Sequence, residues 1–258
     1  GGVTLACVVG VPAGALLGQF WGWRSAFWAV ALLSVPAVVT VARSVPPGIA
    51  GPRPPLRGEL RSLRAPRLLV LLLLGALVNG ATFCTFTYLA PLATKEAGLA
   101  GSWVPAVLAL FGLGAFAGVR FGGRFADARA ELIVGAGGTA LCLGWAALAI
   151  GAGEPAVLAG LVLVQGALSF GVGSTLISQA LYAAPGAPTL AGGFATAAFN
   201  VGAACGPWLG GTAIDAGAGF RSPVWVSAGL VAVALGTVAA VRLKRRARQG
   251  RTPASWGV

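Results

Sequence analysis

The sequence predicts an all-α polytopic membrane protein with about eight transmembrane helices, and two observations carry this prediction. The first is composition, because 57% of the 258 residues are hydrophobic and only 9% are charged. An ordinary soluble domain has about 25% charged residues, so this chain has too little polar surface to face water. The second is a series of eight long runs without charge, each near the length of about 20 residues that a helix needs to cross a bilayer. Barrel strands would be about 10 residues long and alternate in polarity.

The eight predicted spans cover most of the chain in order. They are Gly2–Phe20, Ser25–Ala42, Leu68–Ala90, Trp103–Val119, Leu132–Gly151, Pro155–Ser178, Ala191–Ile214 and Val224–Val241.

The basic residues alternate between the connections of these spans. One alternate set of connections contains fifteen Lys and Arg residues and the other contains three, namely Arg24, Lys95 and Arg221. Basic loops stay in the cytoplasm. We therefore expect both termini to be cytoplasmic. The excess of Arg over Lys, with abundant Ala, Gly and Pro, suggests a bacterial genome, so we expect the protein to lie in the bacterial inner (cell) membrane. The same scatter of charge between apolar runs argues against a nucleic-acid partner, although the net charge is +12.

Only the connection 43–67 is long, and the five prolines between residues 46 and 55 disfavour a helix. It divides the chain into predicted parts: residues 1–42 as two helices of a first bundle, 43–67 as a cytoplasmic linker, 68–241 as a six-helix bundle and 242–258 as a basic tail. One interpretation of the linker's arginines is that their positive charge keeps it in the cytoplasm. Another is that they bind lipid.

The first and seventh spans share a glycine pattern. Gly10, Gly14 and Gly18 recur 192 residues later as Gly202, Gly206 and Gly210, and similar loops follow at 23–28 and 220–225. Glycines four apart lie on one helix face and let another helix approach closely. The pattern fits either generic helix packing or a duplication of six-helix halves. Under the duplication we expect Gly14 and Gly206 to lie where helices of the two halves cross.

Two motifs and three longer segments carry a family resemblance. Residues 202–211 match the antiporter signature GxxxGPxxGG, whereas the copy at 10–19 departs from it. Residues 123–129 resemble a cytoplasmic gating motif. With segments 1–18, 75–91 and 196–202, the chain resembles the major facilitator superfamily, within it the twelve-helix drug:proton antiporter family and its actinobacterial chloramphenicol-resistance exporters.

The resemblance implies that the chain holds helices five to twelve of twelve. The absence of Met, with Gly1 inside an apolar run, also predicts an internal or carboxy-terminal fragment. The implied activity is export of a small, neutral, partly apolar drug by proton antiport, with the intact protein a monomer in the lipid bilayer. A sugar or metabolite exporter of the same fold is the alternative.

Candidate substrate residues lie on two spans that, by the resemblance, line the cavity. Asn79, Phe83 and Phe86 share one helix face, with Tyr88 beside it, and Gln165 and Ser169 share a face of another span. Aromatic surface with a few amide and hydroxyl groups suits a neutral ligand. The same polar groups could instead form hydrogen bonds between helices. Asn200 is expected to support packing of the eleventh helix together with the signature residues Gly202, Gly206, Pro207 and Gly210.

Asp127, with Arg124 and Arg129, is the candidate gate, because a carboxylate at a helix end can change partners between states. A solvated charged turn is the alternative. None of the six acidic residues lies in the middle of a span and the chain has no His. A proton-coupling carboxylate is therefore expected in helices absent from this chain.

The chemistry-bearing residues do not indicate an enzyme, a metal site or a cofactor. A membrane-embedded enzyme would need a nucleophile, a base or paired carboxylates at membrane depth, and a structural membrane protein would not require a gating turn. The four cysteines form no CxxC pair and are expected to be small buried apolar residues.

Overall fold

The computed structural model describes residues 10–44, 59, 64–187 and 190–249. Every regular element in these ranges is helical. The predicted linker therefore lies outside the described residues except at its two ends and at Glu59, and so do residues 1–9 of the first span and the end of the tail.

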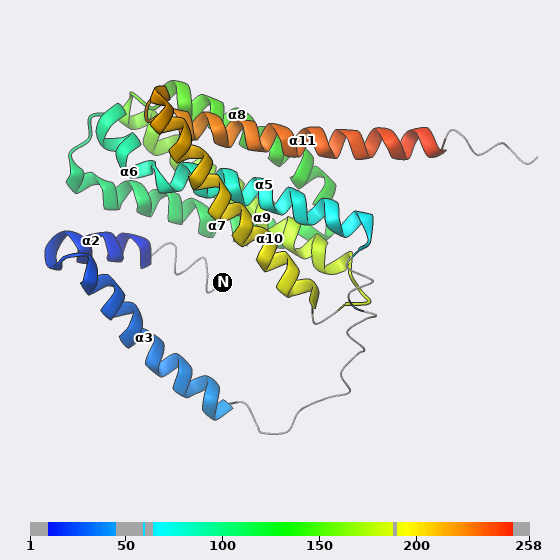
Figure 1. The fold of residues 1–258 in the computed structure, drawn as a ribbon, viewed down its shortest axis with the longest axis horizontal. Coiled ribbons are helices and arrows are strands. Elements are labelled where there is room, and N and C mark those ends of the chain that lie inside the picture. The colour runs from blue at the N-terminus through cyan, green and yellow to red at the C-terminus, as the bar shows by residue number, and fades with distance from the viewer. Residues whose placement is uncertain (1–9, 45–58, 60–63, 188–189, 250–258) are drawn as a thin grey trace, which may run out of the picture.

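Two helices form a hairpin at the side of the molecule (Figure 1). They are α2, Val11–Trp21, and α3, Trp23–Ser44, which join at Gly22 with φ 81°. A positive φ is costly for residues with a Cβ and is available to glycine, so Gly22 allows the sharp reversal. No residue of α3 is buried. The hairpin corresponds to the first two predicted spans.

Six long helices form the bundle that follows. They are α5 Pro66–Thr87, α7 Val104–Leu132, α8 Gly138–Gly151, α9 Pro155–Tyr182, α10 Leu190–Ala213 and α11 Ser222–Gln249. Short elements continue three of them: α6 Leu89–Pro91 with η2 Leu92–Glu96 after α5, η4 Ile133–Gly137 before α8, and η5 Ile214–Ala218 after α10. The 3₁₀ turn η3, Gly101–Trp103, precedes α7. All six predicted spans of this region are thus confirmed as helices.

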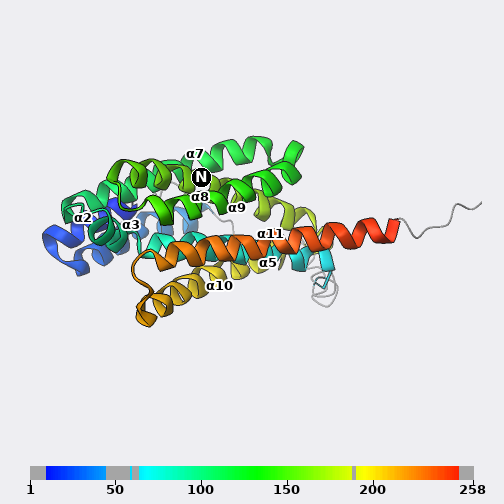
Figure 2. The ribbon, with the colours of Figure 1, turned by 90° about the horizontal axis from the view of Figure 1, so that it is seen from above.

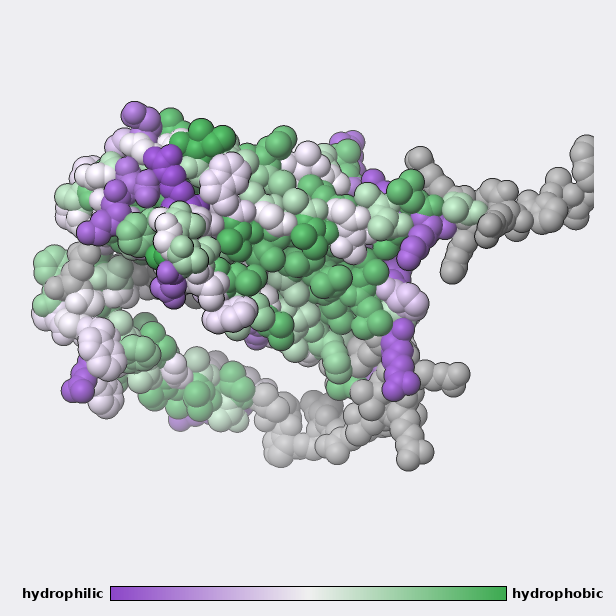
Figure 3. Space-filling view, turned by 45° about the horizontal axis from the view of Figure 1, so that its top comes forward, coloured by the Kyte–Doolittle hydropathy of each residue, from purple (hydrophilic) through white to green (hydrophobic). Residues whose placement is uncertain are grey.

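Six helical segments of the described residues are long and apolar enough to cross a membrane. They include α3 and five helices of the bundle. The remaining long helix, α10, is 24 residues long but is built largely from Gly and Ala, which lowers its hydropathy. Hydrophobic residues gather across the middle of the bundle, and hydrophilic ones lie toward its two ends (Figure 3). This distribution is the one that a bilayer requires of a multi-span protein.

The helices of the bundle pack in two close pairs, α7 with α9 and α5 with α10. α11 crosses α5 and α8, and α5 also contacts α9. The two views in Figures 1 and 2 show these helices running side by side along the long axis. The hairpin approaches this bundle through α2, which contacts α7.

Contacts between connections place them at two opposite ends. At one end the Arg221 guanidinium Nε lies 2.7 Å from Glu96 Oε2, and Arg221 Nη1 donates to the Ile150 carbonyl at 3.2 Å. Glu96 and Arg221 belong to connections predicted to share one side, and Ile150 lies at the end of α8 next to the third such connection. At the other end, Glu59 accepts a hydrogen bond from Leu190 N at 3.0 Å, and Arg242 lies 3.9 Å from Glu131.

One boundary differs from the prediction. The connection predicted between the fourth and fifth spans is not a loop, because α7 continues helically to Leu132 with non-helical backbone only at Arg129 (φ −139°, ψ 32°). The reversal is made at this kink. Residues 123–132 contain no proline and only one glycine, so nothing in their sequence opposes helix on either side of it.

Candidate substrate-facing surface

One face in the second half of α5 is half-buried, whereas the residues between its members are buried. Asn79, Phe83 and Phe86 are half-buried, whereas the intervening residues 80–82 and 84–85 are buried. The buried faces meet α9, α10 and α11. The three residues therefore share a half-buried face, which contrasts with the buried faces of the helix.

An aromatic cluster extends from this face to two other helices. The Phe83 and Phe86 rings meet edge to face at 6.1 Å between centroids. Phe86 then packs on Phe111 of α7 at 4.8 Å, and Phe111 on Phe170 of α9 at 6.2 Å. Aromatic pairs in this range stabilise each other beyond simple burial. The four rings therefore form a packed apolar cluster that connects α5, α7 and α9.

Two polar side chains of α5 bind the backbone of α10. The Asn79 amide Nδ2 donates to the Phe199 carbonyl at 2.7 Å, and the Tyr88 hydroxyl donates to the Pro207 carbonyl at 3.0 Å. Both are hydrogen bonds between helices, which the sequence analysis gave as the alternative to contact with a substrate. The bond from Nδ2 orients the Asn79 amide without using its side-chain carbonyl oxygen, which stays chemically able to accept a hydrogen bond.

The signature glycines lie along the same contact between α5 and α10 as these two hydrogen bonds. A Cβ on Gly202 would meet the Ala76 carbonyl, and one on Gly206 would meet the Gly80 carbonyl. A Cβ on Gly210 would lie 2.8 Å from Cys84 Sγ. The backbones of α5 and α10 are thus in direct contact, and only glycine fits at these positions of α10.

We expected Gly206 to lie between the two halves, and the close contact that it makes in this structure is with α5. Its partner, Gly80, belongs to the same six-helix bundle. The prediction of a close crossing was right, but the glycine spacing does not identify the partner helix. On α2, a Cβ added to Gly10, Gly14 or Gly18 would have nothing within 4 Å among the described residues, so no close crossing is formed there.

Gln165 and Ser169 share a face of α9, as predicted, but this face is inside the bundle. Gln165 has 0% of its surface exposed, and its Nε2 donates to the Leu141 carbonyl of α8 at 3.0 Å. Ser169 is 3% exposed. These contacts favour the interhelical role for Gln165 over contact with a substrate.

The candidate gate is only partly described. Arg124 and Arg129 are exposed, and Arg129 carries the kink that ends the regular part of α7. The Asp127 side chain lies outside the described residues.

Other predicted residues have mixed surroundings. Asn200 is exposed on α10. Of the cysteines, Cys84 is buried as expected, whereas Cys142 is half-buried and Cys205 is exposed; the exposed residue contradicts the expectation of burial. Among the described residues, no group of three His, Cys, Asp or Glu side chains is placed to hold a metal ion.

Sequence reasoning missed the second close helix pair and half of the aromatic cluster. A Cβ on Gly114 or Gly118 of α7 would meet the Leu163 or Ala167 carbonyl of α9. The four-residue spacing of Gly114, Gly118 and Gly122 was the available signal. Phe111 and Phe170 could not be connected to Phe86 from the sequence, because their contact depends on how three helices pack.

Comparison with known proteins is consistent with this architecture. Residues 1–189 match the family model of the Major Facilitator Superfamily. The chain is 52% identical to a chloramphenicol resistance protein of Streptomyces lividans over 238 residues, 91% of this chain and 61% of the relative. It is 36% identical to the inner membrane transport protein YdhP of Escherichia coli over 85% of this chain and 56% of the relative.

A third relative, the purine ribonucleoside efflux pump NepI of Salmonella paratyphi C, is 28% identical over 93% of this chain and 60% of its own length. The chain thus spans about three fifths of the length of these relatives. The family match over most of the chain, together with its multi-span helical bundle, shows that the chain belongs to the Major Facilitator Superfamily.

Proposed function

We propose that this chain is part of an exporter of small, neutral, partly apolar molecules of the chloramphenicol kind. The observation that carries the proposal is the half-buried face of α5, where Asn79, Phe83 and Phe86 combine an amide with aromatic rings. Such a surface binds a ligand by apolar contact and a few hydrogen bonds and offers no charge to attract an ion. The similarity to the Streptomyces chloramphenicol resistance protein supports the same ligand class.

Within this proposal the residues have distinct roles. Phe83 and Phe86 contact the ligand, and the cluster with Phe111 and Phe170 holds their rings in place. Asn79 supplies its side-chain carbonyl oxygen as an acceptor. Tyr88 fixes the outer end of α5 on α10, and Gln165 and Ser169 act as packing residues of α9.

Proton antiport is the coupling that we propose. A charge at the centre of a bilayer costs at least about 2.5–3.5 kcal/mol, so carboxylates there are rare and functional. The six acids of this chain lie outside the middle of the predicted spans. The proton-accepting carboxylate is therefore proposed to lie in the part of the relatives that this chain does not match.

Asp127, Arg124 and Arg129 are proposed as a gate at the kink after α7. Non-helical backbone at Arg129 interrupts the helix, and exposed arginines on both sides of Asp127 give its carboxylate partners that can exchange.

The proposed orientation places the linker, Asp127 and the tail in the cytoplasm of a bacterial cell. Reporter fusions test it directly. Fusions at Arg57, Asp127 and Arg251 should behave as internal, and fusions at Lys95, Glu154 and Gly219 as external, because basic connections are retained inside. A clear inversion at any one of the six positions would contradict the eight-span topology.

A chimera tests the proposed ligand. In it, this chain replaces the matched segment of the Streptomyces lividans protein, and accumulation of radiolabelled chloramphenicol is measured in cells that contain it. We expect lower accumulation than in vector controls. Phe83→Ala and Phe86→Ala should each weaken export, whereas Phe121→Ala, at a ring that is 66% exposed on α7, should not.

The same cells can be loaded with a radiolabelled purine ribonucleoside, the ligand class in the name of the Salmonella relative. Export of the nucleoside without export of chloramphenicol would replace the proposed ligand class. Export of chloramphenicol unaffected by either phenylalanine variant would show that the α5 face is not the contact surface.

A further inference from the structure

A groove lies on the outside of the bundle between α11 and the segment formed by η4 and the start of α8. Its volume is about 600 Å³. Most of its lining is small or aliphatic: Leu132, Gly135, Ala136, Leu235, Val238 and Ala239. Glu131, Arg242 and Thr139 complete the lining. The groove is therefore an apolar trough with charged groups at one end, which matches the polarity of an amphiphile.

The charged end of the groove carries an accessible arginine. The Arg242 side chain is 55% exposed and lies 3.9 Å from Glu131, which is 92% exposed. An exposed ion pair at this distance contributes little, so a phosphate can replace Glu131 as the partner of the guanidinium. Of the lining residues, Arg242 is the cation and Glu131 the anion, and Arg129 and Lys244 lie close to them in the sequence.

Glycine at position 135 makes room for this guanidinium. Arg242 Nη2 lies 3.8 Å from where a Cβ of Gly135 would stand, so the arginine extends over the floor of the groove rather than away from it. An oxyanion at the mouth of the groove would meet the donors of Arg242 directly, and guanidinium groups suit phosphate oxygens.

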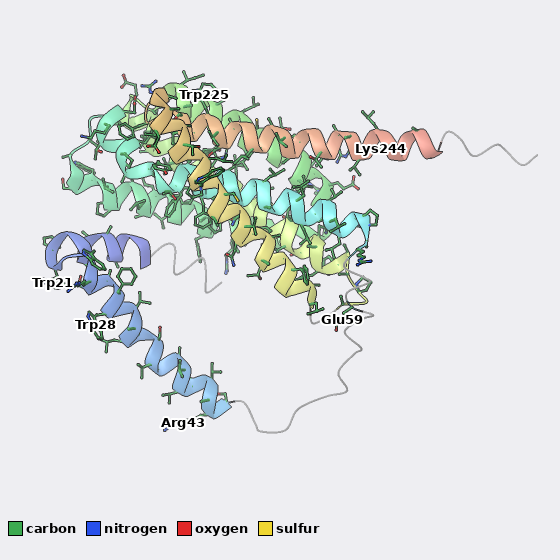
Figure 4. All side chains as sticks on the ribbon, in the orientation of Figure 1. Trp21, Trp28, Arg43, Glu59, Trp225 and Lys244 are labelled. Atoms are coloured by element: carbon green, nitrogen blue, oxygen red, sulfur yellow. The ribbon has the colours of Figure 1, made fainter. Side chains whose placement is uncertain are left out.

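The position of the groove relative to the membrane also suits an amphiphile. The two helical segments that border it, Arg129–Gly151 and Ser222–Lys244, are both candidate membrane spans. The charged start of the first segment and the charged end of the second lie together at one end of the groove. This places Arg242 at the depth of the lipid headgroups and the apolar part of the groove in the hydrocarbon. Lys244 marks this end of α11 in Figure 4.

The groove also faces away from the hairpin. α2 contacts the bundle through α7, whereas α8 and α11 lie on the opposite side of the bundle (Figure 1). Helices that pack beside α2 and α3 would therefore leave the groove in contact with lipid.

We propose that this groove binds an anionic phospholipid, with the phosphate at Arg242 and one acyl chain along Leu235 and Val238. Basic pockets between helices at a membrane surface bind such headgroups, and each basic residue near the surface contributes about a fivefold gain in affinity. The proposal rests on the membrane embedding of the bundle and is independent of the transported ligand.

Native mass spectrometry of the purified chain tests the proposal, with phosphatidylglycerol and phosphatidylcholine of identical acyl chains as probes. We expect phosphatidylglycerol to be retained more, and Arg242→Gln to reduce its retention about fivefold. Ala136→Phe, which fills the trough and keeps the charge, should lower retention of both lipids. Arg24→Gln, at an exposed arginine of the hairpin, is the matched control and should leave retention unchanged.

Equal retention of the two lipids would overturn the proposal, and so would equal losses in Arg242→Gln and Arg24→Gln. Displacement of phosphatidylglycerol by millimolar inorganic phosphate, with no effect of Ala136→Phe, would identify an anion site instead of a lipid site. Circular dichroism of each variant confirms that a loss does not come from unfolding.

Discussion

The α2–α3 hairpin and the α10–α11 hairpin are built around the same turn. Gly22 and Gly219 both have positive φ, 81° and 76°. Three residues later, Ser25 and Ser222 each donate a side-chain hydrogen bond of 2.7 Å to the carbonyl of that glycine. Trp28 and Trp225 follow at equal distances, so the offset between the two turns is 219 − 22 = 197 residues.

The glycine patterns on the preceding helices are offset by 202 − 10 = 192 residues instead. The five extra residues of the second hairpin are the five residues of η5, Ile214–Ala218. The two regions are therefore one structural unit with a single local insertion, which supports duplication over chance similarity of small residues.

The surroundings of the two hairpins differ. Gly202, Gly206 and Gly210 are buried against α5, whereas the glycines of α2 meet no described atom at Cβ distance and α3 has no buried residue. Trp21 and Trp28 mark the hairpin that stands apart from the bundle, and Trp225 marks the packed one (Figure 4). The difference teaches that glycines four residues apart allow another helix to pack closely. They do not determine which helix packs there, because that depends on the rest of the fold.

The largest expected difference is between Gly206→Leu and Gly14→Leu. At Gly206 the new side chain overlaps the Gly80 backbone, and such overpacking costs about 1–3 kcal/mol or more. At Gly14 the space is open, and the higher helix propensity of Leu makes the change neutral or slightly stabilising. Thermal unfolding of the purified chain in detergent should show a lower Tm for Gly206→Leu alone. Equal losses would mean that α2 already has a close partner.

A comparison of Arg221→Gln with Arg24→Gln tests how much the arginine of each turn contributes to stability. Arg221 pairs with Glu96 and binds the Ile150 carbonyl, while exposed Arg24 lies 5.4 Å above the Trp23 ring. Because the Arg221–Glu96 pair is part-exposed, its loss should cost only about 1 kcal/mol. The change at Arg24 should cost about 0.5 kcal/mol or less. Denaturant unfolding of both variants checks the order, and the reverse order would contradict a stabilising role for the Arg221–Glu96 pair.

The smallest effects are expected at Ser25→Ala and Ser222→Ala. Each removes the hydroxyl that bonds to a turn glycine, which contributes about 0.5–1.5 kcal/mol; the Ser25 hydroxyl also lies 3.0 Å from the Leu17 carbonyl. Because the bond has the same length in both turns, the two losses should agree within about 0.5 kcal/mol. Unfolding free energies of the two variants check this, and a loss at one turn only would break the structural equivalence.

The sequence was sufficient to predict the helices because hydrophobicity over about 20 residues is a local property. The shared face of Asn79, Phe83 and Phe86 was predictable for the same reason, since helical periodicity determines it. Which helix Gly206 meets, and whether Gln165 points to a cavity or to Leu141, depends on tertiary packing. The kink at Arg129 was also missed, because charge density predicted a loop where the backbone reverses within a helix.

Transport by the chain alone, compared with transport by the Streptomyces chimera, tests the account most directly. Alternating access needs two bundles that move around a site between them, and the open faces of α2 and α3 show where this chain lacks such a partner. With both proteins present at equal levels in the membrane, the chimera should lower radiolabelled chloramphenicol accumulation and the 258-residue chain should match the vector control. Export by the chain alone would contradict the account, because the six-helix bundle would then contain the whole site.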